Sequence, residues 1–332
     1  MRVASLIFAL ATLAALPHAA AASVRTIAEA PAAFSLNASY TYLYVTDPKV
    51  NQLEVLDPSY NLVKTYTGLN TPVGDYVDPK GNLYVANEGT CAGTGNVVEY
   101  AHGSASPTYT YSAGLNCPLY AVADANGHVF VYDYAGALTS NVVEYRQKTN
   151  TVLATWNTCN TGTYAFCYPT GLTIDASGHV FATLYGAVHG SLSYYWTVDD
   201  VYYKLKNVQA YVTGYTGPAG GVAVDKHRNI LVSANSVPSS GSAGKVPSGS
   251  WGIVEQHYPY GGSDNAPVDL NYFGFTFVSE LALSADQKSL FVADYGGATL
   301  TVLTYPNGNF VTALGIANGL TDPDGVALGP SP

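Results

Sequence analysis

The sequence predicts an all-β fold, a six-bladed β-propeller with four-stranded blades whose ring is closed by a blade shared between the two ends of the chain. Three observations predict this fold. Tyr, Val, Thr, Gly and Asn are abundant, with 28 Tyr in 332 residues, and this composition favours strands and turns over helices. A unit of about fifty residues recurs along the chain. The strand that the first unit lacks reappears at the C-terminus.

Each unit has the same pattern of four short strands. In the clearest unit an apolar run from Pro72 ends at Asp78, a turn follows, and an aromatic and β-branched run ends at Asn87. The turn contains Gly81, and glycine adopts positive φ at little cost. A Val-Val-Glu-Tyr segment ending at Tyr100 and a Thr-Tyr-Thr-Tyr segment complete the unit. Four such strands are typical of a propeller blade.

The blades follow one another in order, and the first is composite. Residues 42–47, 52–55 and 62–66 predict its second, third and fourth strands. Residues 323–328 predict its first strand. Five complete units lie between and begin at Pro72, Pro118, Pro169, Pro218 and Glu280. A shared blade closes the ring and leaves no long open edge. In the alternative, an open solenoid, the two ends would not meet and a blade split between them would not be expected. We therefore expect one propeller domain over residues 40–330.

The Pro-x-Gly-Val-Ala-Val-Asp and Gly-Asn-Leu-Tyr-Val-Ala-Asn patterns resemble the NHL-repeat propellers over roughly residues 40–330. They resemble the gluconolactonase-like six-bladed propellers more distantly. The second resemblance implies a divalent ion over the channel, held by Glu, Asn and Asp. Of the residues in this sequence that stand at the positions of those metal ligands, only Asp324 suits a hard cation. Glu280 lies one residue away from such a position. Ca²⁺ takes six to eight oxygen ligands, so these two residues are a sparse metal site. The fold also carries unrelated activities.

The N-terminus predicts export. Arg2 precedes an apolar run over residues 3–16, and Ala20-Ala21-Ala22 provides a small-residue cleavage site. We expect a signal peptide over residues 1–22, a lead-in over residues 23–39, and a secreted or periplasmic location. No later segment is long and apolar enough to predict a membrane span.

The four cysteines predict two disulfides in an oxidising compartment. Three pairings are possible. The repeat places Cys91 between the second and third strands of its blade and Cys117 in the next connection between blades. Cys159 and Cys167 share the connection after that. The pairing of nearest neighbours, Cys91–Cys117 and Cys159–Cys167, therefore fits the register best.

The charge balance indicates the class of partner. The formal net charge is −10, with 13 Lys and Arg against 23 Asp and Glu, which argues against a nucleic-acid partner. We expect a monomer that binds a small molecule, a glycan, or a peptide or protein.

The candidate ligand-binding residues lie on the face that carries the blade connections and the loops between second and third strands. Long insertions at 184–199, 235–251 and 260–279 are predicted there, and long loops in compact repeats are often functional. His189, near Asp199 and Asp200, is the one candidate general base. His128 and His179 fall in tight turns on the opposite face. The candidate ligand-binding residues are Tyr185, His189, Tyr195, Trp196, Asp199, Asp200 and Trp251.

Two further sets of acidic and amide residues recur with the repeat. One set stands where second strands end and is predicted to cap loop backbone. The other stands on third strands and is predicted to mark a solvated face. These sets are Asp47, Asn87, Asp133 and Asp294, and Glu54, Glu99, Glu144 and Glu255.

The sequence thus predicts a ligand- or protein-binding propeller without demonstrable chemistry. The alternative is a divalent-metal-dependent hydrolase, lactonase-like, or a lyase, with Glu280 and Asp324 at the channel mouth. Ca²⁺ or another divalent ion is the one cofactor that this alternative would need.

Overall fold

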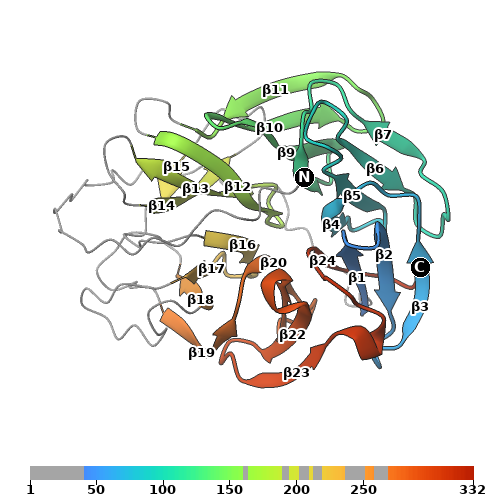
Figure 1. Cartoon of the computed structure of the whole chain (residues 1–332), viewed down its shortest axis with the longest axis vertical. Coiled ribbons are helices and arrows are strands. Elements are labelled where there is room, and N and C mark those ends of the chain that lie inside the picture. Colours follow the sequence, from blue (N-terminus) through green and yellow to red (C-terminus); the bar gives the residue numbers. More distant parts are fainter. Residues whose placement is uncertain are drawn as a thin grey trace.

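A computed structural model describes residues 41–159, 164–188, 194–201, 209–211, 219–235, 251–257 and 268–332. These residues form six four-stranded antiparallel sheets arranged around a central axis, which confirms the predicted propeller (Figure 1). The innermost strand of each sheet contacts the innermost strands of both neighbouring sheets, so the ring is closed. Among the described residues no helix is long and apolar enough to cross a membrane. The predicted signal peptide and lead-in lie outside the described residues.

Blade 1 is shared between the two ends of the described chain, as predicted. Its sheet has the order β24-β1-β2-β3, with β24 at the axis. Tyr44 of β1 pairs with Ala327 of β24, and the Tyr44 hydroxyl donates to the Pro330 carbonyl at 2.9 Å. The four strands are β24 (Val326–Gly329), β1 (Tyr42–Asp47), β2 (Gln52–Leu56) and β3 (Leu62–Tyr66).

Blades 2 to 6 follow in chain order, each running from the axis outward. Blade 2 is β4 (Pro72–Val77), β5 (Leu83–Asn87), β6 (Asn96–Tyr100) and β7 (Tyr109–Tyr111). Blade 3 is β8 (Pro118–Ala123), β9 (His128–Gly136), β10 (Thr139–Arg146) and β11 (Val152–Asn157). Blade 4 is β12 (Tyr164–Ile174), β13 (Val180–Val188), β14 (Tyr194–Val201) and β15 (Gln209–Tyr211). Blade 5 is β16 (Ala219–Val224), β17 (Ile230–Asn235), β18 (Trp251–Gln256) and β19 (Val268–Phe275). Blade 6 is β20 (Val278–Leu283), β21 (Ser289–Asp294), β22 (Thr299–Thr304) and β23 (Phe310–Leu314).

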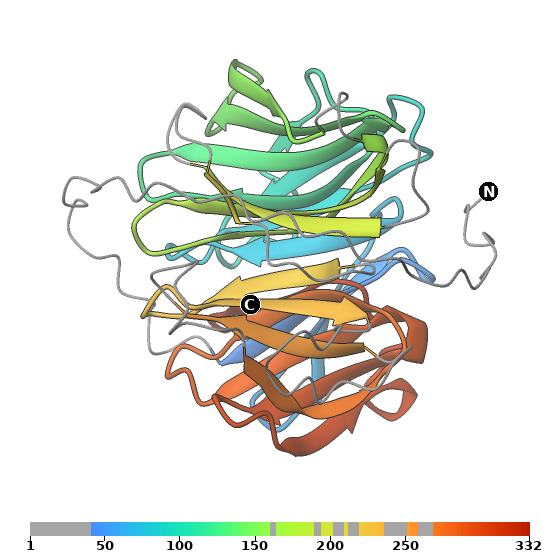
Figure 2. The ribbon, with the colours of Figure 1, turned by 90° about the vertical axis from the view of Figure 1, so that its left-hand side faces the viewer.

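The strands run from one face of the ring to the other, as the side view shows (Figure 2). We call loop face the face with the connections between blades, such as 112–117, and the loops between second and third strands, such as 88–95. We call turn face the opposite face, with turns such as 78–82 and 101–108.

The turn between the first and second strands is built the same way in successive blades. The Asp78 carboxylate accepts the backbone N–H groups of Lys80 and Asn82 at 2.8 and 2.9 Å. Asp124 accepts those of Asn126 and His128, both at 2.8 Å. Such side-chain bonds hold a tight turn without help from the rest of the fold. His128 therefore lies in a turn of the turn face, as predicted, and His179 follows Asp175 in the same way.

The side chains at the ends of the second strands hold the connections between blades. Asp133 accepts the backbone N–H groups of Asn116 and Cys117 at 2.9 and 2.8 Å. Asp47 accepts those of Thr321 and Asp322 at 2.6 and 2.9 Å. Asn87 and Asp294 accept from their own incoming connections. These side chains do cap backbone, but the prediction that each caps its own loop is correct only for Asp294, which also accepts the backbone N–H of Gly297 at 3.3 Å.

The prediction of a solvated face for the third-strand glutamates is wrong, because these side chains are buried. Glu99 accepts the Tyr111 hydroxyl at 2.6 Å from the fourth strand of its own blade. Glu255 accepts the Tyr305 hydroxyl at 3.0 Å from the next blade. In these two blades the neighbouring strand or blade covers the glutamate, and tyrosine provides the hydrogen bond that a buried carboxyl group needs.

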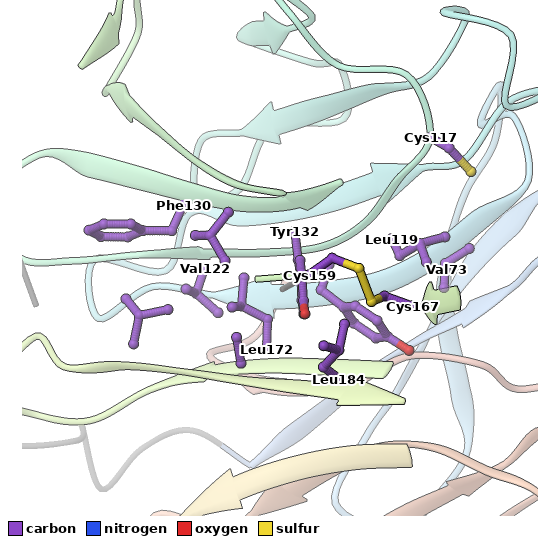
Figure 3. Packing of buried hydrophobic residues seen from close by; sticks show 14 residues of the cluster. Val73, Cys117, Leu119, Val122, Phe130, Tyr132, Cys159, Cys167, Leu172 and Leu184 are labelled. Carbon is purple, nitrogen blue, oxygen red and sulfur yellow. A yellow bond between two sulfur atoms is a disulfide. The ribbon is translucent and has the colours of Figure 1, made fainter. Parts of the chain in front are cut away.

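The apolar core lies between neighbouring blades. Between blades 3 and 4, Phe130 and Tyr132 of β9 pack with Leu172 of β12 and Leu184 of β13 (Figure 3). Both disulfides belong to this cluster, so they fix the loop-face ends of blades 2 to 4.

The insertion predicted as a loop over Leu184 to Asp199 is largely strand. Tyr185 of β13 pairs with Trp196 of β14, and Leu184 pairs with Thr197. The Tyr-Tyr-Trp-Thr-Val segment is rich in aromatic and β-branched residues, so it continues the sheet. The resulting strands are as long as those of blade 3, with nine residues in β13 and β9 and eight in β14 and β10. The insertion at 260–279 likewise includes β19.

Candidate functional site

One position of the innermost strand determines which side chains fill the axis of the propeller. Four blades have glycine there, Gly74, Gly171, Gly221 and Gly325, while blades 3 and 6 have Tyr120 and Glu280. A Cβ on Gly74 would lie 2.6 Å from the Tyr120 ring, and a Cβ on Gly221 would lie 2.5 Å from the Cα of Glu280. Glycine therefore leaves the space that these two larger residues occupy.

Tyr120 spans the axis. Its hydroxyl donates to the Ser279 carbonyl at 3.3 Å, and blades 3 and 6 stand opposite each other in the ring. The side chain is buried. The Ser279 hydroxyl in turn donates to the Asp324 carbonyl at 2.6 Å. Tyr120 thus forms an aromatic floor across the channel, linked to the start of β24.

Two buried carboxyl groups lie beside this floor. Glu280 Oε2 accepts the backbone N–H of Val326 at 3.1 Å, and Asp75 of blade 2 lies nearby. Asp75 is 2% exposed, and neither of its carboxylate oxygens has a hydrogen-bond partner. Burial raises the pKa of both groups well above the usual range, and the Asp75 charge raises that of Glu280 further. The axis therefore favours their neutral forms unless a positive charge is nearby.

Two more acidic residues stand near the loop-face mouth of the channel. Asp324 precedes β24 and is half-buried. Glu88 follows β5, and its Oε1 lies 3.1 Å from Sγ of Cys91 and 3.6 Å from Sγ of Cys117. The pKa of the Tyr120 hydroxyl is raised by burial and then by the charges of Asp324, Glu280 and Glu88. Carboxylates from three different blades thus surround one tyrosine hydroxyl.

Half-buried aromatic side chains adjoin this mouth on blades 3 and 4. The rings of Tyr134 and Tyr168 are 5.0 Å apart, and those of Phe166 and Tyr185 are 6.3 Å apart. The backbone N–H of Tyr134 donates to the Cys117 carbonyl at 3.0 Å, so one disulfide positions Tyr134. We call Tyr134, Phe166, Tyr168 and Tyr185 the aromatic rim.

A second aromatic group lies on blades 5 and 6. Trp251 packs its ring 5.1 Å from that of Phe277, which lies 6.3 Å from that of Tyr295. Trp251 is buried, whereas Phe277 is 40% exposed. Trp251, predicted to contact ligand, thus supports Phe277 from beneath.

The structure separates the residues predicted to form one loop. Tyr195 and Trp196 stand at the loop-face end of β14, paired with Gly186 and Tyr185. Asp199 and Asp200 pair with Ala182 and Phe181 farther along the strand, and at about 3.3 Å per residue Asp199 lies about 16 Å from Tyr194. His189 lies outside the described residues.

Asp200 also has a repeat equivalent. It stands in the register position of the buried Glu99 and Glu144 of neighbouring blades, which pair with Tyr84 and Phe130. The two aspartates therefore belong to the body of the blade by their backbone position, not to the loop face.

The predicted disulfides are confirmed. Cys91 bonds to Cys117 with a Cα–Cα distance of 4.4 Å, and Cys159 bonds to Cys167 with 5.9 Å. Cys167 lies within β12 and not in the preceding connection, because β12 begins at Tyr164.

The described residues do not fit a divalent ion at the channel mouth. Glu280 and Asp324 do come together on neighbouring blades. Within the described part of the chain, however, one group of three His, Cys, Asp or Glu residues has its ligand atoms within 4.8 Å of one another, and it is Glu88, Cys91 and Cys117. Both cysteines of that group are in a disulfide. A Ca²⁺ donor set is therefore not assembled around Glu280 and Asp324.

Sequence reasoning missed three residues of the site, Asp75, Tyr120 and Glu88. Tyr120 could have been identified from the sequence, because it stands where most repeats have glycine, as Glu280 does. Asp75 stands where other first strands have an apolar residue. Glu88 had no signal beyond its closeness in sequence to Cys91.

Comparison with known proteins finds similarity of fold. No protein-family profile and no curated protein matches the sequence. A structure of a nidogen/laminin complex matches with a TM-score of 0.61 at 12% identity, covering 87% of this chain and 98% of that one. The periplasmic gluconolactonase PpgL of Pseudomonas aeruginosa matches with a TM-score of 0.55 at 12% identity, covering 88% and 99%. Hydrazine synthase of Kuenenia stuttgartiensis matches with 0.57 at 12% identity, covering 92% of each chain. The chain thus shares the β-propeller fold of binding proteins and lactonases.

Proposed function

We propose that this protein is an exported ligand-binding propeller, similar to NHL-type modules, that holds a small molecule, glycan or peptide on its loop face. The observation that carries the proposal is the aromatic rim, whose half-buried rings on blades 3 and 4 adjoin the closed axis. Half-buried aromatic side chains offer large contact area at low entropic cost and are typical of ligand sites. The two disulfides anchor the strands and connections that carry them.

Binding fits the axis better than metal-assisted hydrolysis does. Glu280 already accepts the Val326 backbone N–H, and glycine at four of the six ring positions leaves few donor atoms for a cation. Tyr120 provides an aromatic floor at the same level. A floor of this kind supports a ligand resting at the mouth of the channel.

Export is supported by the two disulfides, since disulfides persist in oxidising compartments such as the periplasm or the medium. One of the structural neighbours is described as a periplasmic gluconolactonase. A secreted or periplasmic location would give the loop face access to ligands outside the cytoplasm.

The exported protein can be screened by thermal shift against neutral sugars, lactones, short peptides and amines, followed by titration of the hits. We expect a hit whose affinity falls at least tenfold in a Tyr134→Ala/Tyr168→Ala variant, because aromatic anchors that a ligand covers contribute more than about 1.4 kcal/mol. Phe310→Ala is the matched control, since Phe310 is 52% exposed on the outer strand β23.

A hit whose affinity is unchanged in the double variant would contradict the loop-face site. Turnover of a lactone that depends on added Ca²⁺ would favour the hydrolase instead.

A further inference from the structure

We propose that the loop-face site takes a ligand with an alkylammonium group, held by Tyr168 and Tyr120 together with the carboxylates of Glu88 and Asp324. The inference rests on the proposed function and adds the chemical class of the ligand. Aromatic faces attract organic cations, and carboxylates beside the rings supply the countercharge.

The first support is convergence. Glu88 of blade 2, Asp324 of blade 1 and Glu280 of blade 6 all act electrostatically on the Tyr120 hydroxyl, and so does Tyr168 of blade 4. Residues so far apart in sequence meet at the axis because each stands at the loop-face end of its blade.

The second support is the buried Asp75 carboxylate. It is 2% exposed and both of its oxygens are without a hydrogen-bond partner. It lies at the axis, where a Cβ on Gly325 would come within 2.6 Å of its Oδ1, and Asp324 immediately precedes Gly325. A buried carboxyl group without partners is costly, and a cation seated above it would reduce that cost.

The third support is the distribution of positive charge. Among the Lys and Arg residues that the structure describes, Lys49 lies in a loop of the loop face and Lys64 on the outer strand β3. The others lie at or beside turns of the turn face: Lys80, Arg146, Lys148, Lys226, Arg228 and Lys288. The described charges at the channel mouth are therefore acidic, and they favour an incoming cation.

An organic cation suits this mouth better than a metal ion. The carboxylate oxygens of Asp75, Glu280 and Asp324 do not gather within 4.8 Å of one another, as the ligands of a small ion would. An alkylammonium group is larger than a metal ion, and it can contact aromatic ring faces and carboxylates that lie farther apart.

The probe is choline, titrated calorimetrically into the exported protein. Its control is 3,3-dimethylbutan-1-ol, which has the shape of choline with carbon in place of the charged nitrogen. We expect choline to bind more tightly than the neutral isostere and its affinity to fall as salt is added. Tyr168→Ala should weaken choline binding about two- to thirtyfold.

Glu88→Gln and Asp324→Asn should each weaken choline binding. The charge-matched control is Asp286→Asn, since the Asp286 side chain is 58% exposed on the turn face and its loss should leave choline binding unchanged. Should Asp324→Asn fail to fold, Glu88→Gln and Tyr168→Ala still test the inference from other blades.

Equal affinity for choline and its isostere, no choline binding at all, or acidic substitutions no more harmful than Asp286→Asn would each overturn the inference. The proposed function survives such a result if a neutral hit from the screen depends on Tyr134 and Tyr168. It fails separately if no hit of any charge depends on them.

Discussion

Tyr120 and Glu280 occupy a position where four other blades have glycine, and these two replacements decide what lies on the axis. The tyrosine crosses the ring to the Ser279 carbonyl, and the glutamate accepts the Val326 backbone N–H from the neighbouring blade 1. Their burial joins opposite sides of the ring by polar contacts. The cost of burying the carboxyl groups is lowered where they remain protonated.

Buried acids make the stability of the fold depend on pH, and Glu54 is the clearest case. Glu54 is 2% exposed, and burial together with the nearby Asp47 charge raises its pKa to about 8. Between its unfolded pKa and about 8, the folded state holds more protons than the unfolded state, so stability falls as pH rises. Glu54→Gln has no proton to lose and should remove this part of the fall.

The measurement is the melting temperature of both proteins at about pH 5 and about pH 9. The wild type should lose more stability on going to high pH than Glu54→Gln does. Other buried acids, such as Asp75 and Glu280, contribute in the same direction in both proteins and cancel in the comparison. Parallel pH profiles would show that Glu54 is ionised at neutral pH in the folded protein.

At the scale of the elements, the composite blade 1 closes the ring. β24 supplies the innermost strand of blade 1, and Asp47 at the end of β1 holds Thr321 and Asp322 just before it. One short strand therefore completes a sheet and contacts the innermost strands of both neighbouring blades.

Deleting residues 321–332 should destabilise the domain by about 5 kcal/mol, because it removes the buried Val326, four ladder pairs with β1 and the donors to Asp47. That loss is comparable to the whole stability of many domains. Chemical denaturation measures it, and deletion of Ser331 and Pro332 alone is the control that keeps β24. A full deletion as stable as this control would mean that the ring does not depend on the shared blade.

The strands of blade 4 show how an element can exceed its repeat. β13 and β14 are longer than their equivalents in blades 1, 2, 5 and 6, as long as those of blade 3, and carry Tyr185 and Trp196 to the loop-face edge. The backbone positions of Asp199 and Asp200 remain in the body of the blade, and Asp200 stands where neighbouring blades have Glu99 and Glu144.

At the scale of the molecule, the repeat predicts the architecture because each blade encodes its strands, turns and caps locally. Asp78 and Asp133 bond to backbone within their own turn or the adjoining connection, so their roles are readable from spacing. The disulfide pairing followed from the same register.

The candidate site was less predictable, since it depends on residues that meet across the ring. Asp75 and Glu88 of blade 2 meet Tyr120 of blade 3, Glu280 of blade 6 and Asp324 of blade 1 at the axis, and this proximity follows from ring closure and not from any local motif. The burial of Glu99 likewise depends on Tyr111 lying beside it, which spacing along one strand does not show.

The two faces of the ring differ in chemistry, and this difference underlies the functional account. The loop face has the aromatic rim, both disulfides and the acidic channel mouth. The turn face has short turns held by aspartates and most of the described Lys and Arg residues.

Hydrogen exchange of the exported protein, with and without a saturating ligand from the screen, tests the central claim most directly. Ligand should slow exchange in segments 134–140 and 164–170 of the loop face, because burial and hydrogen bonding there would suppress local opening. Segments 124–128 and 175–179 of the turn face should exchange at unchanged rates. Protection confined to those turn-face segments, with the aromatic rim unaffected, would contradict the assignment of the binding face.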